Sequence, residues 1–209
     1  MPSKDSDFVR PDRYREIDSA DKYDAGIRKP SLPRRFSHAM EEWALKRALA
    51  RVDGGGLVLD SPSGTGRIHE ELQQKFDEVF SLDSSHAMLV VHQNHTHSGR
   101  AVTGDIFNLP YADNQFDHVV CYRLFHHMQN DADRVAILKS IARVAKKDVV
   151  FTAWVDTLIN KRRGSRRRTL TRKQLGTIIN QAGLKMDYIT FASWPFQPKT
   201  VVVCSKLNA

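Results

Sequence analysis

The sequence predicts an α/β protein in which a mostly parallel sheet carries helices on both faces. From residue 57 onward, short apolar runs alternate with periodic stretches of helical length. This alternation is typical of βαβ units, whose right-handed crossovers build a parallel sheet. The last two apolar runs lie only a few residues apart, which is too close for a helical crossover. We therefore expect them to pair antiparallel as a C-terminal hairpin.

Length and composition favour one packed domain. The chain has 209 residues, of which 41% are hydrophobic and 9% aromatic, enough for a single core. Cys121 and Cys204 lie in separate apolar runs, which favours reduced core thiols in a cytoplasmic protein. The N-terminus is charged, and no stretch approaches the ~20 apolar residues of a membrane span. We therefore expect neither a signal peptide nor an integral membrane protein.

The first part of the chain differs from the rest. Residues 1–35 are rich in charge and proline, which predicts an N-terminal arm with a short helix near Tyr14–Tyr23. Residues 36–209 form the expected domain. Apolar residues at helical spacing predict its first helix over Phe36–Val52, and the glycines of Asp53–Gly56 end that helix.

The later elements follow in order along the chain. Apolar and β-branched runs predict strands at Leu57–Asp60, Glu78–Asp83, Ala101–Thr103, His118–Tyr122, Val149–Val155, Lys185–Ser193 and Thr200–Ser205. Helical periodicity predicts helices at Arg67–Phe76, Ser85–His95, Ala132–Ala145 and Thr171–Ala182, the last stopped by Gly183.

The excess positive charge is concentrated in one segment. The net charge is +8, from 32 basic and 24 acidic residues. Residues 161–173 (KRRGSRRRTLTRK) hold eight of the basic residues and no acidic one. The remaining 24 basic and 24 acidic residues balance, so the sequence describes a neutral domain with one basic segment. Thr169 or Thr171 would cap the helix that follows.

This basic segment is compatible with a solvated loop or with one of three anionic partners: a small molecule, a membrane surface that holds a lipid substrate, or RNA. RNA recognition usually adds exposed aromatic residues, and the segment contains none. A membrane-adsorbed loop needs apolar anchors, and only Leu158, Ile159 and Leu170 flank it. An anionic small molecule or lipid head group is therefore favoured, with RNA as the alternative. Arginine binds such groups through paired hydrogen bonds, and the candidate substrate ligands are Arg163, Arg166, Arg167 and Arg168.

A glycine turn, Ser61–Arg67, follows the first expected strand. Glycine lets a ligand approach the backbone N–H groups at a helix N-terminus, although a plain tight turn is the alternative interpretation. Asp83 ends the next strand, 17 positions after Gly66, where a carboxylate can accept hydrogen bonds from both ribose hydroxyls. His69 stands where a dinucleotide fingerprint has its third glycine, and the carboxylate of Asp60 would repel a pyrophosphate. Ribose together with a positive charge favours S-adenosylmethionine over NAD.

Four segments together resemble class I S-adenosylmethionine-dependent methyltransferases, in the small-molecule group (methyltransferase type 11 domain) that includes the ubiquinone and menaquinone C-methyltransferases. They are VLDSPSGTGR (58–67), SLDSSHAML (81–89), GDIFNLPYADNQFDHVVCYRLFHHM (104–128) and the helix end Ala142-Arg143-Val144. The resemblance covers about residues 57–155 and implies a Rossmann-like sheet of seven strands, the last inserted antiparallel. It implies a cytoplasmic methyltransferase, with a peripheral position at the inner membrane surface as an alternative.

Carried onto this sequence, the resemblance also implies which residues bind the cofactor. Asp60 and the glycines would surround the methionine part, and Asp83 would hold the ribose. Met88 would lie near the adenine, with Asp105 at its edge, and the backbone of Cys121 near the amino-acid end. The cofactor-binding residues so implied are Asp60, Ser61, Gly64, Gly66, Asp83, Ser84, Met88, Asp105, Ile106 and Cys121.

The segment after the fourth expected strand supplies the catalytic candidates. Methyl transfer is an in-line displacement that mainly needs aligned reactants and the exclusion of water. His126 and His127 would lie at the sheet edge where ligands bind and are candidate bases. Alternatively, they pack against the cofactor loop and cap local backbone. Arg123 is expected to pair with a carboxylate of cofactor or substrate, or else with Asp131 or Asp133.

Three further expectations concern the remaining motifs. His92, His95 and His97 lack a Cys or carboxylate at a ligand spacing, so we predict no metal and a solvated helix end instead. In methyltransferases similar to this chain the arm often covers the cofactor as a lid, which implies roles for Tyr14, Tyr23 and Arg28, unless it is a disordered tail. A non-catalytic cofactor-binding adaptor is the alternative to an enzyme, but the intact set of cofactor-binding acids and glycines disfavours it.

Overall fold

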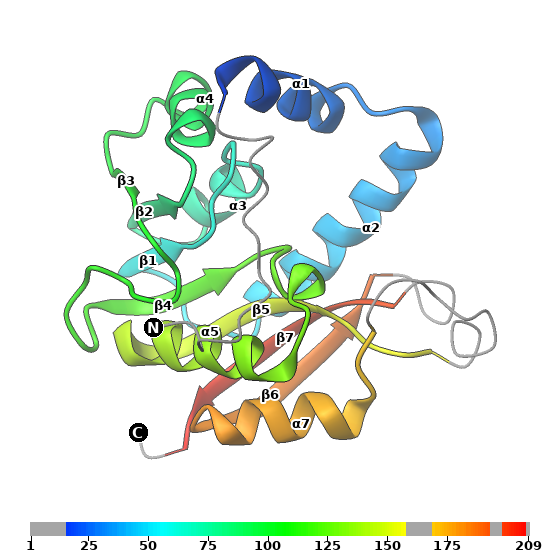
Figure 1. The fold of residues 1–209 in the computed structure, drawn as a ribbon, viewed down its shortest axis with the longest axis vertical. Helices are drawn as coiled ribbons and strands as arrows, with labels where there is room; N and C mark the ends of the chain where they lie inside the picture. Colours follow the sequence, from blue (N-terminus) through cyan, green and yellow to red (C-terminus); the bar gives the residue numbers. More distant parts are fainter. Residues whose placement is uncertain (1–15, 158–168, 193–197, 208–209) are drawn as a thin grey trace.

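The computed structural model describes residues 16–157, 169–192 and 198–207 (Figure 1). These residues form a seven-stranded sheet of order β3-β2-β1-β4-β5-β7-β6. The strands are β1 Leu57–Asp60, β2 Glu78–Asp83, β3 Ala101–Thr103, β4 Phe116–Cys121, β5 Ala145–Trp154, β6 Leu184–Phe191 and β7 Lys199–Lys206. The helices are α1 Ile17–Arg28, α2 Leu32–Leu49, α3 His69–Gln73, α4 His86–Thr96, the 3-10 helix η2 Phe125–His127, α5 Asp131–Val144 and α7 Arg172–Gln181.

The strand directions confirm the predicted fold class. β1 pairs parallel with β2 and β4, β2 pairs parallel with β3, and β4 pairs parallel with β5. β7 lies antiparallel between β5 and β6, which confirms both the C-terminal hairpin and the inserted antiparallel strand. No helix of the described ranges has the length and apolar character needed to cross a bilayer.

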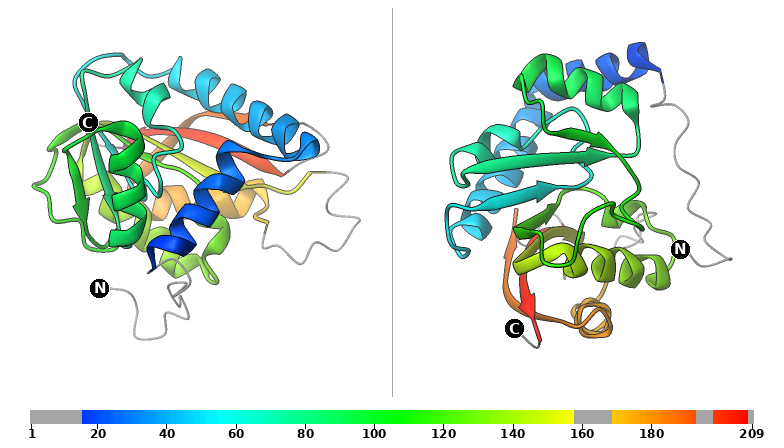
Figure 2. Two further views of the ribbon diagram at one scale, coloured as in Figure 1. Left: turned by 90° about the horizontal axis from the view of Figure 1, so that it is seen from above. Right: turned by 90° about the vertical axis from the view of Figure 1, so that its left-hand side faces the viewer.

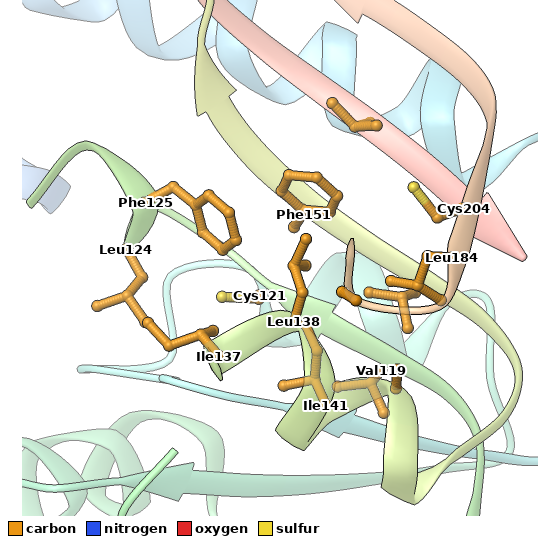
Figure 3. Packing of buried hydrophobic residues seen from close by; sticks show 14 of the residues in the cluster. Val119, Cys121, Leu124, Phe125, Ile137, Leu138, Ile141, Phe151, Leu184 and Cys204 are labelled. Atoms are coloured by element: carbon orange, nitrogen blue, oxygen red, sulfur yellow. The ribbon is translucent and has the colours of Figure 1, made fainter. Parts of the chain in front are cut away.

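Helices cover both faces of the sheet, and a separate hydrophobic cluster lies beneath each (Figure 2). Alternation along the strands divides the side chains between the two clusters. Val58, for example, packs beneath α2 and α3, whereas its neighbour Leu59 packs on the face of α5 and α7. Figure 3 shows the cluster on the face of α5 and α7, in which Cys121 lies close to Phe125 and Leu138.

The cysteines are core residues, as predicted. Cys121 and Cys204 are buried and have free thiols, and burial raises the pKa of both. Thiols in this state pack as small apolar groups and are poor nucleophiles.

The structure shifts several predicted element bounds. α2 begins at Leu32, before the predicted start at Phe36, because the chain turns directly from α1 into it. α3 is shorter than predicted, since the glycine turn continues to Ile68. β5 begins at Ala145, where it already pairs with Phe116 of β4. Residues 1–15, with Tyr14, lie outside the described residues.

The histidine motif of α4 is only partly a solvated helix end, and that prediction was wrong for His92. His92 is fully buried, with Nε2 3.0 Å from Ser81 Oγ and Nδ1 3.1 Å from Thr96 Oγ1. It is buried because its face of α4 packs on the glycine turn, where a Cβ added to Gly66 would lie 2.9 Å from its ring. His95 instead pairs with Asp24 of α1 at 2.9 Å. Within the described residues, no group of three or more His, Cys, Asp or Glu side chains could hold a metal ion.

The start of β1 is held by carboxylates that accept from its backbone. Asp117 Oδ2 accepts from the Leu57 N–H at 3.0 Å, and Asp77 Oδ2 accepts from the Gly56 N–H at 2.7 Å. The bond from Leu57 lowers the pKa of Asp117. The two hydrogen bonds fix where β1 begins and therefore where its carboxyl end lies.

We predict that Gly56→Ala destabilises the protein by about 2 kcal/mol. Gly56 has φ +71°, and an added Cβ would lie 2.3 Å from Asp117 Oδ2, so the substitution meets both backbone strain and a clash. Urea unfolding measures the effect. The matched control is Gly176→Ala within α7, where an added Cβ meets nothing within 4 Å. It should be neutral or stabilising, and equal losses in the two variants would contradict the prediction.

We also predict that His92 contributes a loss of stability between pH 6.5 and pH 4. Burial, and then the charges of His69 and His95, lower the pKa of His92 to about 4. In this window the imidazole of His92 binds a proton in the unfolded chain but not in the folded chain, so acidification costs about 3 kcal/mol through this group. In urea unfolding as a function of pH, acidification should therefore be less unfavourable to the stability of His92→Gln than to that of the parent chain. His86→Gln, at an exposed site of the same helix, should keep the pH dependence of the parent chain, and an unchanged pH dependence in His92→Gln would refute the assignment.

Candidate functional site

The carboxyl end of β1 carries an isolated buried carboxylate. Asp60 has no solvent exposure, and neither of its carboxylate oxygens has a hydrogen-bond partner in the described structure. Burial, and then the nearby charge of Asp83, raise its pKa well above the ordinary value. The hydroxyls of Ser61, Ser63 and Thr65, in the turn that follows, are also buried without a partner there. A group of buried polar atoms of this kind suits a ligand that brings hydrogen-bond donors or positive charge.

Asp83, at the end of β2, ties the glycine turn to the sheet. Its Oδ2 accepts from the Gly64 N–H at 2.8 Å, and its Oδ1 accepts from the Ser85 N–H at 2.9 Å. Burial raises the pKa of Asp83 despite these bonds. The exposed Ser84 lies between Asp83 and α4. The structure thus brings Asp60, Gly64 and Asp83 together, as the sequence predicted from their strand ends.

The other residues implied for the cofactor differ in their surroundings. Met88 is buried beneath α1, in a cluster with Ala20 and Tyr23. Asp105 lies in the loop after β3, where its Oδ1 accepts from the Phe107 N–H at 3.1 Å. Ile106 and Cys121 are part of the main hydrophobic core, so only their backbone could meet a ligand.

A cleft opens beside the glycine turn, between α1 and α2 on one side and the ends of β4 and β5 on the other. Its wall includes five basic side chains and one acidic side chain. Tyr23, His38, His126, His127 and Trp154 contribute rings to the same wall. The basic residues are Lys22, Arg34, Arg67, Arg123 and Lys199, and the acidic residue is Glu41. Arg67 belongs to the glycine turn, so the cleft and the turn adjoin.

Glu41 of α2 is the centre of this charged wall. Arg123 Nη1 donates to Glu41 Oε2 at 2.7 Å, and Arg67 Nη2 lies 3.4 Å from the same oxygen. Lys199 Nζ donates to Glu41 Oε1 and, at 2.9 Å, to Ser37 Oγ. Burial opposes ionisation of Glu41, but the three cations hold its pKa below the ordinary value. One carboxylate therefore faces three cations, and the cluster keeps a net positive charge.

The described structure pairs Arg123 with neither Asp131 nor Asp133. Its guanidinium pairs with Glu41, while Asp131 pairs with Arg134 at 2.5 Å. The backbone explains this direction, since Arg123 has φ +62° and its N–H donates to Thr152 Oγ1 at 2.5 Å. The chain turns there, and the side chain points towards α2. Sequence reasoning missed Glu41, Arg67 and Lys199, because nothing local marks residues that meet only in the folded chain.

The two candidate bases lie on η2 at the cleft. The ring of His126 stacks on Trp154, with centroids 4.5 Å apart and planes 4° apart. The ring of His127 follows, 4.0 Å from that of His126. Both histidines line the cleft, so their imidazole rings form part of its wall.

Most of the basic segment lies outside the described residues, including the four candidate substrate ligands Arg163, Arg166, Arg167 and Arg168. At its described end, Thr171 caps α7 by accepting from the Gln174 N–H at 3.2 Å, which confirms one of the two predicted caps. The hydroxyl of Thr169 donates to Asp156 instead.

Comparison with known proteins agrees with this geometry. Residues 59–153 match a family model described as a methyltransferase domain. The chain is 35% identical over 92 residues to a demethylmenaquinone methyltransferase of Thermotoga maritima, covering 43% of this chain and 39% of that protein. It is 34% identical over 134 residues to the protein of that name from Thermobifida fusca, covering 61% and 53%. The match thus spans about half or less of these relatives' length.

Solved structures share the fold at low sequence identity. An S-adenosylmethionine-dependent methyltransferase from Clostridium acetobutylicum matches with a TM-score of 0.65 and 16% identity, over 90% of this chain and 97% of that chain. The magnesium protoporphyrin IX methyltransferase of Synechocystis, with S-adenosylmethionine bound, matches with a TM-score of 0.60 and 17% identity, over 93% and 90%.

The matched sequence contains the buried carboxylate of β1, the glycine turn and Asp83, and the shared fold places all three at one sheet edge. The comparisons support S-adenosylmethionine as the cofactor. In the sequence of residues 59–153 and in its fold, this chain resembles the class I S-adenosylmethionine-dependent methyltransferases, including those that methylate demethylmenaquinone.

Proposed function

We propose that this chain is an S-adenosylmethionine-dependent methyltransferase that acts on an anionic small molecule or lipid head group. The main observation that supports this proposal is that the carboxylate of Asp60 is fully buried and has no hydrogen-bond partner in the described structure. A buried unpaired carboxylate destabilises the protein when no ligand is bound. A cationic ligand would explain why the protein keeps one here. The amino-acid end of S-adenosylmethionine carries an ammonium and a sulfonium, and it fits this position.

The residues around Asp60 fit the rest of the cofactor. Ser61, Gly64 and Gly66 would surround its methionine part, and Asp83 would accept from the ribose hydroxyls beside the bonds it already receives from Gly64 and Ser85. Met88, Ser84, Asp105, Ile106 and Cys121 complete the proposed binding set. Tyr23 packs in the cluster of Met88, which supports the proposal that the N-terminal arm, residues 1–35, covers this end of the domain, residues 36–209.

The chemistry required of the protein is mainly positioning. When bound, S-adenosylmethionine supplies a methyl group on a sulfonium, which an acceptor atom attacks in line. The chain has to hold the acceptor in the cleft and exclude water. We propose that His126 or His127 takes a proton from an acceptor that must lose one. Stacking on Trp154 fixes the orientation of His126.

The charge of the cleft supports an anionic acceptor. Five basic residues and one acidic residue line it, and a guanidinium binds carboxylate or phosphate through paired hydrogen bonds. Arg123 and Arg67 already bind one carboxylate, that of Glu41. We propose that Arg123 also contacts the acceptor, and that Arg163, Arg166, Arg167 and Arg168 extend the positive charge. The demethylmenaquinone methyltransferases among the relatives support a small-molecule acceptor over RNA. We propose that the protein is cytoplasmic. If its acceptor is a lipid, we propose that it lies at the inner membrane surface.

We predict that Asp60→Asn weakens S-adenosylmethionine binding and stabilises the protein alone. The loss of a charge-assisted hydrogen bond should cost about 1.5–3 kcal/mol of binding free energy. Removal of the buried carboxylate should raise the free energy of unfolding at pH 7 by about 1 kcal/mol, because its raised pKa opposes folding once the unfolded group is ionised. Titration calorimetry and urea unfolding measure the two effects. Asp53→Asn, at an exposed site, should change neither, and unchanged affinity in Asp60→Asn would refute the cofactor site.

We predict that Arg123→Gln impairs use of the acceptor more than binding of the cofactor. Transfer of a labelled methyl group from S-adenosylmethionine is measured into a cell extract at several dilutions, and the product is separated into small-molecule, lipid, RNA and protein fractions. Label should enter the small-molecule or lipid fraction, with the half-saturating extract concentration raised about tenfold or more in the variant. Lys139→Gln, on the exposed face of α5, should leave it unchanged. Label confined to RNA or protein would contradict the proposed acceptor.

A further inference from the structure

The outer face of α2 carries an exposed stripe of apolar side chains. Leu32, Phe36 and Trp43 are 77%, 65% and 45% exposed, and Ala39 between them is also exposed. Their spacing of four, three and four residues places them on one side of the helix. We refer to these four residues as the apolar stripe.

The rest of the helix already has its packing partners. Ala44, Leu45 and Ala48 are buried in the cluster beneath α2, and Glu41 faces the cleft with its three cations. The described core therefore does not use the apolar stripe. Single exposed apolar residues need no explanation, but a continuous exposed row of large ones marks an interaction site.

The exposed charges on α2 and next to its two ends are mostly basic. Between residues 28 and 51 the exposed charged side chains are seven basic ones and one acidic one, Glu42. Arg47 lies over the ring of Trp43, 4.8 Å from its centroid. The basic residues are Arg28, Lys29, Arg34, Arg35, Lys46, Arg47 and Arg51. Figure 1 shows that the N-terminal half of α2 extends beyond the sheet. The exposed fractions place the stripe and these charged side chains at the surface.

This combination selects among possible occupants. A second copy paired through α2 would bring Arg35, Lys46 and Arg47 against the same residues of its partner, which is unfavourable. An anionic bilayer instead accepts apolar and aromatic side chains at the boundary of head groups and acyl chains, and attracts the cations beside them. We propose that α2 docks on the surface of an anionic lipid membrane through the apolar stripe and the basic residues beside it, Arg35, Lys46 and Arg47.

Docking in this way would also place the cleft. Arg34, Ser37 and His38, from the opposite side of the same helical turns, line the cleft. A bilayer in contact with the apolar stripe would thus lie within one helix diameter of the cleft wall, about 10 Å. The proposal itself depends only on α2 and holds whether or not the chain transfers methyl groups.

The test is sedimentation of the full chain with lipid vesicles. We expect binding to phosphatidylcholine vesicles that contain about 40% phosphatidylglycerol, weak binding to pure phosphatidylcholine, and loss of binding in high salt. The double variant Phe36→Ser with Trp43→Ser should bind the anionic vesicles at least about tenfold more weakly than the parent chain. The matched control is Val102→Ser with Leu207→Ser, which replaces residues 40% and 52% exposed elsewhere on the surface and should bind as the parent chain does.

Two further measurements separate the alternatives. Tryptophan fluorescence should shift to the blue when the chain meets anionic vesicles, and Trp43→Phe should remove most of that shift while binding persists. Equal binding by the stripe variant and the parent chain would overturn the proposal and assign membrane contact to the basic segment. A parent chain that ignores both kinds of vesicle would also overturn it. The proposal would also be overturned if analytical ultracentrifugation showed the parent chain as a dimer and the Phe36→Ser, Trp43→Ser variant as a monomer. A second copy of the chain would then cover the apolar stripe.

Discussion

Parallel pairing of β1 with both of its neighbours is the constraint on which the candidate site depends. Asp60 lies opposite Ser81 of β2 and Val120 of β4, so three strands end at the same edge. Parallel strands require helical crossovers, and these bring the next helix back over the sheet. The glycine turn, Asp83 and Arg123 therefore meet at one edge although they follow different strands. The carboxylates that hold the start of β1 fix where this edge lies.

Two buried carboxylates in this region have opposite surroundings. Asp60 lacks a partner in the described structure and has a raised pKa, whereas Glu41 has three cationic partners and a lowered pKa. The first position lacks positive charge and the second has it in excess. A ligand that is cationic at the turn and an acceptor that is anionic in the cleft would correct both imbalances. Under the proposed function, the buried unpaired carboxylate is a cost in stability that the ligand offsets, which is common at functional sites.

α2 connects the body of the domain with its surroundings. Its buried face packs on the sheet, its Glu41 is bound by Arg123 and by Lys199 of β7, and its outer face carries the apolar stripe. One rigid helix thus sets the width of the cleft and presents a surface to the outside. A change on either side of α2 would be felt on the other, because the ion pairs fix the helix to two strand ends.

The sequence by itself determined the α/β class, the succession of strands and helices along the chain, the C-terminal hairpin and the sheet edge at which Asp60 and Asp83 lie. Periodicity reports local geometry, and the turn residues with Asp60 and Asp83 stand at fixed offsets from the strands that carry them. The tertiary structure alone decided the burial of His92 and the cluster around Glu41. Arg123 and Lys199 lie 82 and 158 positions from Glu41 along the chain, and charged residues at such separations leave no local pattern. Their pairing follows from how α2 packs against the sheet, which depends on the whole core and not on any one segment.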